Sequence, residues 1–428
     1  MKVLVVGGGG REHALVWKLH QSPLVSELYC APGNAGIGLL AQIAPIAADD
    51  VAGLRRFAQE NTVDLTVVGP EGALAAGIVD AFQKDGLAIF GPTQAAARIE
   101  SSKLWAKGLM ERAGVPIPRW ATAETPERAL SLAADFGLPV VLKADGLAAG
   151  KGTAVCHTIQ EVRSAVEELM VNRVFGVSGE RLEIEEFLEG SELSAFALVD
   201  GVHVLPLLSA RDHKALLDAN RGPNTGGMGG YARPSNATPE LLEEIRARVF
   251  QPTVDAMAGE GCLFVGVLYA GLFLTRDGPK VIEFNCRWGD PEAQLLLPLL
   301  DSDLVDLMLA CLEGRLDQVS VKWRDQTACG VVLAAAGYPE APRKGDRIAG
   351  LNGVDNDVLV FHAATRAAQS SADGNGGTDF ATDGGRVMTV VAVGDTLVEA
   401  SHRAYANIER IHFDGRQYRS DLAADDTK

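Results

Sequence analysis

Short runs of β-branched and aliphatic residues alternate with amphipathic segments over the first part of the chain, to about residue 92. The runs at 2–6, 27–30, 65–68 and 88–90 have the length of buried strands, and the segments between them have the spacing of helices. Strands that alternate with helices form open parallel sheets, because a parallel pair needs a crossover connection. The sequence therefore predicts an α/β domain at the amino terminus.

The pattern changes after a helix predicted over 94–113, where Gly114, Pro116 and Pro118 interrupt regular structure. Between 125 and 188 two helices and a glycine-rich loop are interleaved with strands, as in a small α+β unit. Those strands are expected at 139–144, 153–156 and 181–187. The chain is thus predicted to be multidomain, with both α/β and α+β parts.

A strand predicted at 327–335 restarts after polar residues, so a last domain is expected there. Inside it, residues 370–385 are rich in Ser, Gly, Asp and Thr and are predicted to form a long flexible loop without function. The expected division is 1–100 for the amino-terminal domain, 101–124 and 192–325 for a central body, 125–191 for a lid, and 326–428 for a small carboxy-terminal domain.

Composition narrows the class of function. A chain of 428 residues with 47% hydrophobic content exceeds one core, so roughly two to four domains are expected. A formal charge of −17 argues against nucleic acid, whose phosphates are held by clustered Lys and Arg. The six cysteines form no CxxC pair, no stretch reaches the roughly 20 apolar residues of a membrane span, and the apolar start is too short for a signal peptide. We expect a cytoplasmic protein with reduced thiols.

The first chemical motif, GGGGREHAL at 7–15, follows the first predicted strand and opens a helix whose free N–H groups favour a phosphate. A dinucleotide fingerprint fits less well, because Glu12 or His13 stands where its third glycine belongs and no acidic residue ends the second strand. A turn with a purely structural role remains an alternative interpretation of this motif. PGNAG at 32–36 and GPEGAL at 69–74 follow later strands of the same sheet, at the edge where such sheets bind ligands.

Two motifs in the middle of the chain suit a nucleotide. KADGLAAGKG at 143–152 ends a strand with a lysine and continues into a loop whose backbone can approach phosphate oxygens. The Walker spacing is absent, and a plain hairpin is the alternative. IEEFLEGSE at 184–192 can offer backbone groups to an adenine edge and the Glu192 carboxylate to ribose hydroxyls. When this motif is considered by itself, an edge strand with solvent-exposed glutamates is the commoner explanation of its polar residues.

The segment VIEFNCRWGDPEAQ at 281–294 carries the most information. Alternation along a strand places Glu283, Asn285 and Arg287 on one face. A carboxylate and an amide oxygen are hard ligands suited to Mg²⁺, and an arginine beside them can hold a phosphoryl group. A polar face on a half-buried strand would explain the polarity but not this order of two ligands and a cation.

Together with VVGPE at 67–71, DHK at 212–214 and GPNTGGMG at 222–229, these motifs resemble the phosphoribosylamine–glycine ligases, also called glycinamide ribonucleotide synthetases. They occur in that family's order from residue 1 to about 420, nearly the whole chain. The resemblance implies an ATP-grasp fold with an amino-terminal open parallel α/β domain and a small carboxy-terminal domain. It also implies conversion of ATP, glycine and 5-phosphoribosylamine to glycinamide ribonucleotide, ADP and phosphate in purine synthesis.

The resemblance further implies roles for individual residues. Catalytic groups would be Arg287, Lys143, Asp212 and Lys214. ATP would be bound by Lys103, Lys143, Gly150, Gly152, Glu185, Glu186, Phe187, Leu188 and Glu192. Glycine and the ribosylamine would be bound by Gly8, Gly9, Gly10, Arg11, Gly33, Asn34, Pro70, Glu71, Asp212, Lys214, Thr225, Gly226, Gly227, Met228 and Arg287. Mg²⁺, or Mn²⁺ in its place, would be held by Glu283 and Asn285.

The chain departs from the wider pattern at three places. A third acidic metal ligand, common in ATP-grasp enzymes, is missing on the preceding strand at 269–272, as it also is in the glycine ligases. Arg211 stands where the family usually has Gln, and Trp288 where it has Phe. Neither substitution removes an expected ligand, although Arg211 could change how substrate is held.

The expected mechanism is attack of the glycine carboxylate on the γ-phosphate, giving glycyl phosphate, followed by displacement of phosphate by the ribosylamine. Because acyl phosphates hydrolyse readily, the lid at 125–191 is expected to close over the site. Small molecules are the expected partners, and a monomer is favoured. Two alternatives stay open: a sister ATP-grasp ligase, which should lack GPNTGGMG and GGGGREH, and a nucleotide-binding regulator, which should have lost a lysine or a metal ligand.

Overall fold

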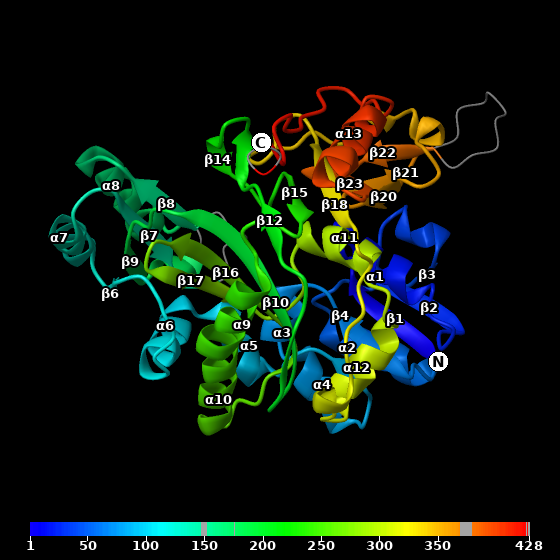
Figure 1. Cartoon of the computed structure of the whole chain (residues 1–428), viewed down its shortest axis with the longest axis horizontal. Helices are drawn as coiled ribbons and strands as arrows, with labels where there is room; N and C mark the ends of the chain where they lie inside the picture. The colour runs from blue at the N-terminus through cyan, green and yellow to red at the C-terminus, as the bar shows by residue number, and fades with distance from the viewer. Residues whose placement is uncertain (147–151, 175, 369–378, 425, 427–428) are drawn as a thin grey trace.

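The computed structural model describes residues 1–146, 152–174, 176–368, 379–424 and 426. The chain forms an amino-terminal sheet, a long central sheet and a small sheet at one side of the molecule (Figure 1). Strands of the carboxy-terminal part continue the central sheet, and the last helix packs against them.

The amino-terminal sheet has five parallel strands in the order β3-β2-β1-β4-β5. Residues 3–6 of the first strand are fully buried, because helices cover both faces of such a sheet. The predicted open parallel α/β domain is confirmed. Its strands are β1 (Lys2–Gly7), β2 (Glu27–Pro32), β3 (Gln42–Ile43), β4 (Leu65–Val68) and β5 (Ile89–Phe90), and its helices are α1 (Gly10–Leu19), α2 (Val51–Glu60), α3 (Glu71–Ala75) and α4 (Ile78–Lys84).

The single helix predicted over 94–113 is wrong, because the chain forms two helices, α5 (Gln94–Ser101) and α6 (Lys103–Arg112). Ser102 between them has an extended backbone, and its hydroxyl accepts a hydrogen bond from the Trp105 N–H at 3.4 Å. A serine that caps a new helix has no distinguishing spacing, so apolar periodicity runs across the break. The break puts Lys103 at the start of α6.

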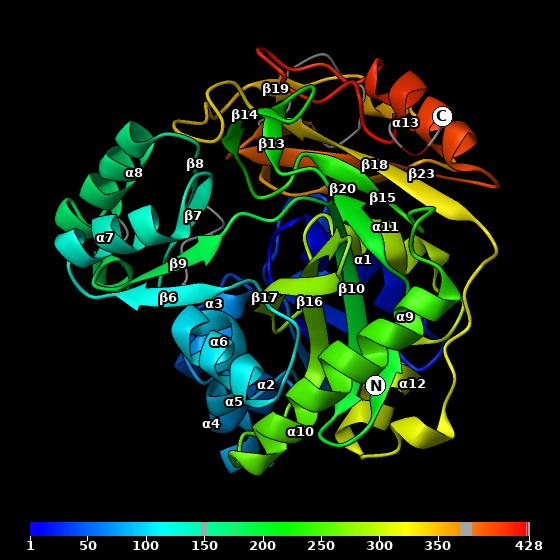
Figure 2. The same ribbon diagram turned by 60° about the vertical axis from the view of Figure 1, so that its left-hand side comes forward.

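The small sheet is antiparallel, with strand order β6-β9-β7-β8, and stands at one side of the molecule (Figure 2). Two helices pack on it and complete a separate hydrophobic core. Threonines 125 and 158 cap these helices through their hydroxyls. The elements are β6 (Trp120–Ala123), α7 (Pro126–Phe136), β7 (Val140–Ala144), β8 (Thr153–Cys156), α8 (Ile159–Val166) and β9 (Leu182–Glu186).

The central sheet is antiparallel and runs in the order β17-β16-β10-β12-β15-β18-β23-β20, with β11 paired to β10. Because β15 pairs with β18, the sheet continues across residues 325 and 326, where the sequence predicts a domain boundary. The strands are β10 (Ser191–Asp200), β11 (Val204–Pro206), β12 (Ala210–Asp212), β15 (Gly229–Ala232), β16 (Val265–Thr275), β17 (Gly278–Asn285), β18 (Thr327–Ala334), β20 (Leu359–His362) and β23 (Arg386–Gly394).

The remaining elements flank the central sheet. The helices are α9 (Pro239–Ile245), α10 (Gln251–Gly259), α11 (Glu292–Leu296), α12 (Leu304–Leu312) and α13 (Leu397–Ile408). A hairpin is formed by β13 (Ala215–Leu217) and β14 (Arg221–Asn224), and a three-stranded sheet by β19 (Arg347–Ile348), β21 (Thr365–Ala367) and β22 (Phe380–Thr382).

The strand β22 corrects the loop predicted over 370–385. It pairs with both β19 and β21, and Thr382 is fully buried. A strand of three residues is too short to show an alternating pattern, and it follows directly on a glycine-rich stretch. The composition of the segment therefore does not reveal β22. Residues 369–378 of that predicted loop lie outside the described residues.

Cys30, Cys156, Cys286, Cys311 and Cys329 are buried free thiols, and Cys262 is partly exposed. Throughout the ranges that the structure describes, no helix combines the length and the apolar character that a membrane crossing requires.

Candidate active site

A cavity of about 420 Å³ is lined by residues of the amino-terminal part, the small sheet and the central sheet, including its strand β23. It brings together residues from every predicted ligand group. Those that line it are Arg11, Glu71, Lys103, Lys143, Glu185, Glu186, Phe187, Leu188, Glu192, Lys214, Thr225, Gly226, Glu283, Asn285 and Arg287.

Other residues predicted for the site are described by the structure but are not part of this lining: Gly8, Gly9, Gly10, Gly33, Asn34, Pro70, Gly152, Asp212, Gly227 and Met228. Met228 is fully buried, its N–H donates to the His213 carbonyl and its carbonyl accepts from Val332, so its polar groups are used within the sheet. Gly150 lies outside the described residues, as does most of its loop.

A buried charge cluster forms the cavity end where the sequence predicts ATP. Glu185 on β9 pairs with Lys143 on β7 and with Lys107 on α6, and Lys107 lies 3.6 Å from Glu183. Burial and the neighbouring Glu185 raise the pKa of Glu183 to about 8. Burial opposes the charge of Lys143, but Glu185 outweighs it and raises the lysine pKa. Lys107 therefore joins the small sheet to the body.

Lys103 reaches toward the small sheet from the first turn of α6. Its Nζ donates to the Gly146 carbonyl at 2.7 Å, next to the loop of the KADGLAAGKG motif. The hydroxyl of Ser102 lies 3.3 Å from Asp145 Oδ1. The two predicted ATP lysines thus approach the cavity from different elements.

The predicted metal ligands Glu283 and Asn285 both line the cavity. The alternation expected for this strand holds only in part, because Ile282 and Phe284 also line the cavity and the pairing of β17 with β16 is irregular at Ile282. Cys286 is buried in the core. Burial would raise the pKa of Glu283, but Lys103, Lys143, Lys214 and Arg287 hold it below its usual value. The strand therefore presents an ionised carboxylate and an amide side by side.

Arg287 is anchored between two carboxylates. Its Nε donates to Glu71 at 3.1 Å, and its Nη2 donates to Glu100 at 2.8 Å and to Asn285 Oδ1 at 3.1 Å. Glu100 also accepts from the Cys286 N–H. The charges of Arg287 and Arg11 outweigh burial and lower the pKa of Glu71 to about 2.

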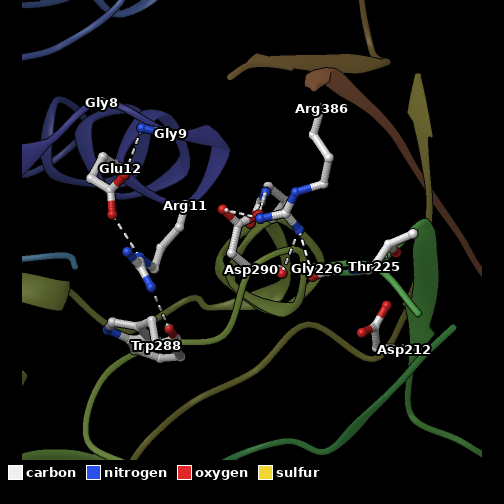
Figure 3. Close-up of polar contacts among 12 residues, drawn as sticks. Gly8, Gly9, Arg11, Glu12, Asp212, Thr225, Gly226, Trp288, Asp290 and Arg386 are labelled. Carbon is white, nitrogen blue, oxygen red and sulfur yellow. Dashed lines mark hydrogen bonds and ion pairs between the residues drawn. The ribbon is translucent and has the colours of Figure 1, made fainter. Parts of the chain in front are cut away.

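The amino-terminal glycine loop is closely packed. Glu12 accepts the Gly9 N–H at 2.6 Å and the Arg11 Nε at 2.6 Å, and Arg11 also donates to the Trp288 carbonyl (Figure 3). The Asn34 amide braces the loop by donating to the Gly8 carbonyl at 2.9 Å. A methyl group on Gly8 would overlap the Gly33 carbonyl, so packing alone requires that glycine. Arg11, in the first turn of α1, lines the cavity.

Lys214 brings a positive charge to the cavity from the DHK motif. Its Nζ lies 2.6 Å from Asp212, and its carbonyl accepts from the Thr225 hydroxyl at 2.8 Å. Burial raises the pKa of Asp212 to about 7, although Lys214 opposes the shift. Asp212 is buried next to Gly227, where a methyl group would lie 2.8 Å from its Oδ1.

Several lining residues were not predicted from the sequence. Asp290 and Glu292 lie in the motif at 281–294, so the sequence pointed to this segment, but it predicted no role for these two residues. Glu292 accepts hydrogen bonds from the Tyr269 hydroxyl at 2.8 Å and from Ser194. Residues outside every quoted motif also line the cavity: Glu100, Lys107 and Arg386.

Comparison with protein families decides the assignment. Family models of phosphoribosylglycinamide synthetase match the N domain at residues 1–100, the ATP-grasp (A) domain at 101–293 and the C domain at 328–425. The chain belongs to the phosphoribosylglycinamide synthetase family.

Relatives over the full length agree. The phosphoribosylamine–glycine ligase of Neisseria meningitidis is 47% identical over 424 residues, 99% of each chain. That of Caldanaerobacter subterraneus is 46% identical over 424 residues, 99% of this chain and 100% of the relative. The crystal structure of the Thermotoga maritima phosphoribosylamine–glycine ligase superimposes with a TM-score of 0.83 at 34% identity, covering 99% of this chain and 100% of that one.

A more distant structure shows the shared fold alone. The biotin carboxylase domain of Hydrogenobacter thermophilus 2-oxoglutarate carboxylase, solved with MgADP, has a TM-score of 0.73 at 17% identity, over 97% of this chain and 91% of that one. As a member of the synthetase family, the chain is an ATP-dependent carboxylate–amine ligase that joins glycine to 5-phosphoribosylamine in purine biosynthesis. The function predicted from the sequence is confirmed.

Proposed function

We propose that ligation proceeds through glycyl phosphate, formed and consumed in the described cavity. The supporting observation is that one cavity is lined by the predicted ATP residues, the predicted metal ligands and residues of both acceptor motifs. A reactive acyl phosphate formed there meets the ribosylamine without crossing solvent, which limits its hydrolysis.

At the ATP end, Lys103 and Lys143 would hold the phosphates, Glu185–Leu188 the adenine and Glu192 the ribose. Lys143 pairs with Glu185 in the structure, so it must exchange that partner for phosphate. Lys107 also pairs with Glu185 and would keep its charge compensated during the exchange. Gly152, at the end of the KADGLAAGKG motif, and Gly150 would contribute backbone contacts when the lid at 125–191 closes.

The residues present fit a divalent cation. Mg²⁺ usually binds one or two carboxylates together with substrate phosphates and water, and Glu283 and Asn285 supply such a set of oxygens beside the cavity. The four surrounding cationic side chains keep Glu283 ionised, as a metal ligand must be. Mg²⁺, or Mn²⁺ in its place, would neutralise charge that develops on the transferred phosphoryl group.

At the acceptor end, Lys214, Thr225 and Gly226 would contact glycine, and Arg11 at the start of α1 would attract the 5-phosphate of the ribosylamine. Asp212 would act through Lys214, which it touches. Gly33, Asn34 and Pro70 would support the phosphate loop, as Asn34 already does through Gly8.

Trapping tests the intermediate directly. With ATP, Mg²⁺, glycine and hydroxylamine but no ribosylamine, the protein should form glycine hydroxamate, because hydroxylamine captures acyl phosphates. Glu283→Gln should lower this rate at least about 100-fold, since charge stabilisation in the transition state is lost. Glu240→Gln, on the exposed start of α9, is the matched control and should leave the rate unchanged. A wild-type protein that ligates glycine but yields no hydroxamate would contradict the proposal.

A further inference from the structure

The carboxylate of Asp290 lies on the cavity wall between two loops assigned to substrate. A methyl group built on Gly9 would lie 3.5 Å from Asp290 Oδ2, and Asp290 itself lines the cavity. On its other side, Asp290 is connected through Arg386 to Gly226 (Figure 3). A ligand that extends from the loop at 7–10 to the loop at 222–229 would pass this carboxylate.

Arg386, the first residue of β23, holds Asp290 in that position. Its Nη1 donates to the Gly226 carbonyl and to the Asp290 carbonyl, both at 2.7 Å, and its Nη2 lies 3.1 Å from Asp290 Oδ2. Gln294 Nε2 donates to the other carboxylate oxygen at 2.7 Å. Because both Nη1 hydrogens go to backbone carbonyls, Arg386 acts by positioning the two loops and Asp290.

The surroundings keep Asp290 ionised. Burial would raise the pKa of its carboxyl, but Arg386 and Arg11 outweigh burial and lower it. An ionised carboxylate accepts hydrogen bonds and donates none, so it repels phosphate and carboxylate groups and binds hydroxyl or ammonium groups.

The ribose hydroxyls of ATP are assigned to Glu192, so the groups left for Asp290 are those of the other two substrates. They are the vicinal hydroxyls and the 1-amino group of the ribosylamine, and the ammonium group of glycine. The hydroxyls belong to the sugar ring that carries the 5-phosphate, and the proposed phosphate ligand is Arg11, which lines the cavity two residues after Gly9. The closeness of Asp290 Oδ2 to Gly9 favours the sugar. Building on the proposed function, we infer that Asp290, oriented by Arg386, binds the ribose hydroxyls of 5-phosphoribosylamine.

Steady-state kinetics of Asp290→Asn test this inference, with the ribosylamine generated in the assay from ribose 5-phosphate and ammonia. Loss of a charged acceptor should raise the KM for ribosylamine about tenfold or more. The KM values for ATP and glycine should stay within about twofold, and hydroxylamine trapping without ribosylamine should proceed at the wild-type rate, because neither uses this carboxylate.

A substrate analogue separates binding from folding. 2-Deoxyribose 5-phosphate and ammonia give a ribosylamine that lacks one hydroxyl. The wild-type enzyme should discriminate against it, and Asp290→Asn should lose most of that discrimination, because the partner of the hydroxyl is gone. Arg386→Lys keeps the charge but replaces the planar fork of two Nη atoms by a single ammonium nitrogen, so it should raise the same KM, and by less than Arg386→Met.

Arg347→Met is the matched control, since Arg347 forms an exposed ion pair with Asp379 away from the cavity lining. All three KM values should match the wild type. A raised KM for glycine in Asp290→Asn would assign the carboxylate to the ammonium group and overturn the inference, as would undiminished discrimination against the deoxy substrate. Absence of hydroxamate from the wild type would instead overturn the glycyl phosphate proposal, leaving the KM comparison as the test of Asp290.

Discussion

In the buried charge cluster at the ATP end of the cavity, glutamates of β9 lie beside lysines that come from α6 and β7. Lys107 and Glu185 are 2% and 1% exposed, and Glu183 is fully buried. Breaking such a pair leaves a charge in a medium that solvates it poorly, which costs far more than the pair itself contributes. Lys107 lies on α6, in the central body of the chain, and pairs with β9 of the small sheet. It is therefore expected to stabilise the fold, although it belongs to no ligand motif.

Lys107→Met should therefore lower the free energy of unfolding by about 3–5 kcal/mol, because the buried carboxylate of Glu185 would lose one of its two lysine partners. Lys280→Met is the matched control: Lys280 pairs with Glu186 of the same strand β9, at 2.9 Å, but both side chains are partly exposed. A loss of about 0–1 kcal/mol is expected there. Urea unfolding followed by circular dichroism measures both, and equal losses would show that burial of the cluster is unimportant.

At the scale of elements, the contact of β15 with β18 joins the ATP-grasp part to the carboxy-terminal strands. The register pairs Gly229 with Val331 and Gly230 with Gly330. Gly229 has φ +119°, and a methyl group there would overlap the Gly330 carbonyl. The strand β15, which begins at the last residue of the predicted substrate motif at 222–229, and β18, the first strand of the carboxy-terminal part, thus approach each other more closely than a side chain at position 229 would permit.

Gly229→Ala should cost about 2–4 kcal/mol, from left-handed backbone strain and from the overlap with a backbone carbonyl that cannot move freely. Gly259→Ala, at the end of α10 with nothing within 4 Å of the added methyl, should cost nothing and could gain up to about 1 kcal/mol. The midpoints of thermal unfolding compare the two variants. Similar midpoints for both would mean that the strand contact relaxes without penalty.

At the scale of the whole molecule, helix α1 meets β20 through two buried histidines. His13 Nδ1 accepts the backbone N–H of His362 at 2.8 Å, and the rings lie 5.7 Å apart. Burial lowers the pKa of His13 to about 3, with the charge of His362 as a second cause, and burial lowers the pKa of His362 to about 4. Both rings are therefore neutral where the amino-terminal and carboxy-terminal parts touch.

This contact predicts a loss of stability in mild acid. An unfolded histidine takes up its proton near pH 6.5, whereas the folded protein resists protonation until about pH 4 or 3. The stability is therefore fully present above pH 6.5 and is lost as the pH falls below it. Between pH 7.5 and 5 the expected loss is about 2 kcal/mol for each histidine.

The variant His13→Asn isolates the effect, because the Asn oxygen can still accept the His362 N–H while the side chain no longer titrates. Its free energy of unfolding should fall by about 2 kcal/mol less than that of the wild type over this pH range. His402→Asn, at an exposed position of α13, should follow the wild type. Urea unfolding at a series of pH values measures the difference, and identical curves for wild type and His13→Asn would refute the assignment of a neutral His13.

Local patterns in the sequence determined the parallel sheet, the small α+β unit and the position of the two metal ligands on one strand. Each depends on residues a few positions apart: the apolar run at 3–6 has the pattern of a buried strand, and Glu283 and Asn285 stand two positions apart on a strand and both line the cavity. Whole motifs likewise indicated the family and its reaction, since their order along the chain needs no coordinates.

Only the tertiary structure decided which residues meet across long separations. Arg287 meets Glu100 187 positions away, and Arg386 meets Gly226 160 positions away. Neither Glu100 nor Arg386 stands in a local pattern, because a helix face and a strand start are polar in most proteins. The strand β22 was hidden for a related reason, because its pairing with β19 and β21 forms only when the chain is folded. The break at Ser102 was hidden because a single capping serine leaves no pattern in the sequence. Periodicity thus determined the elements, and packing between distant elements decided which charges face one another in the cavity.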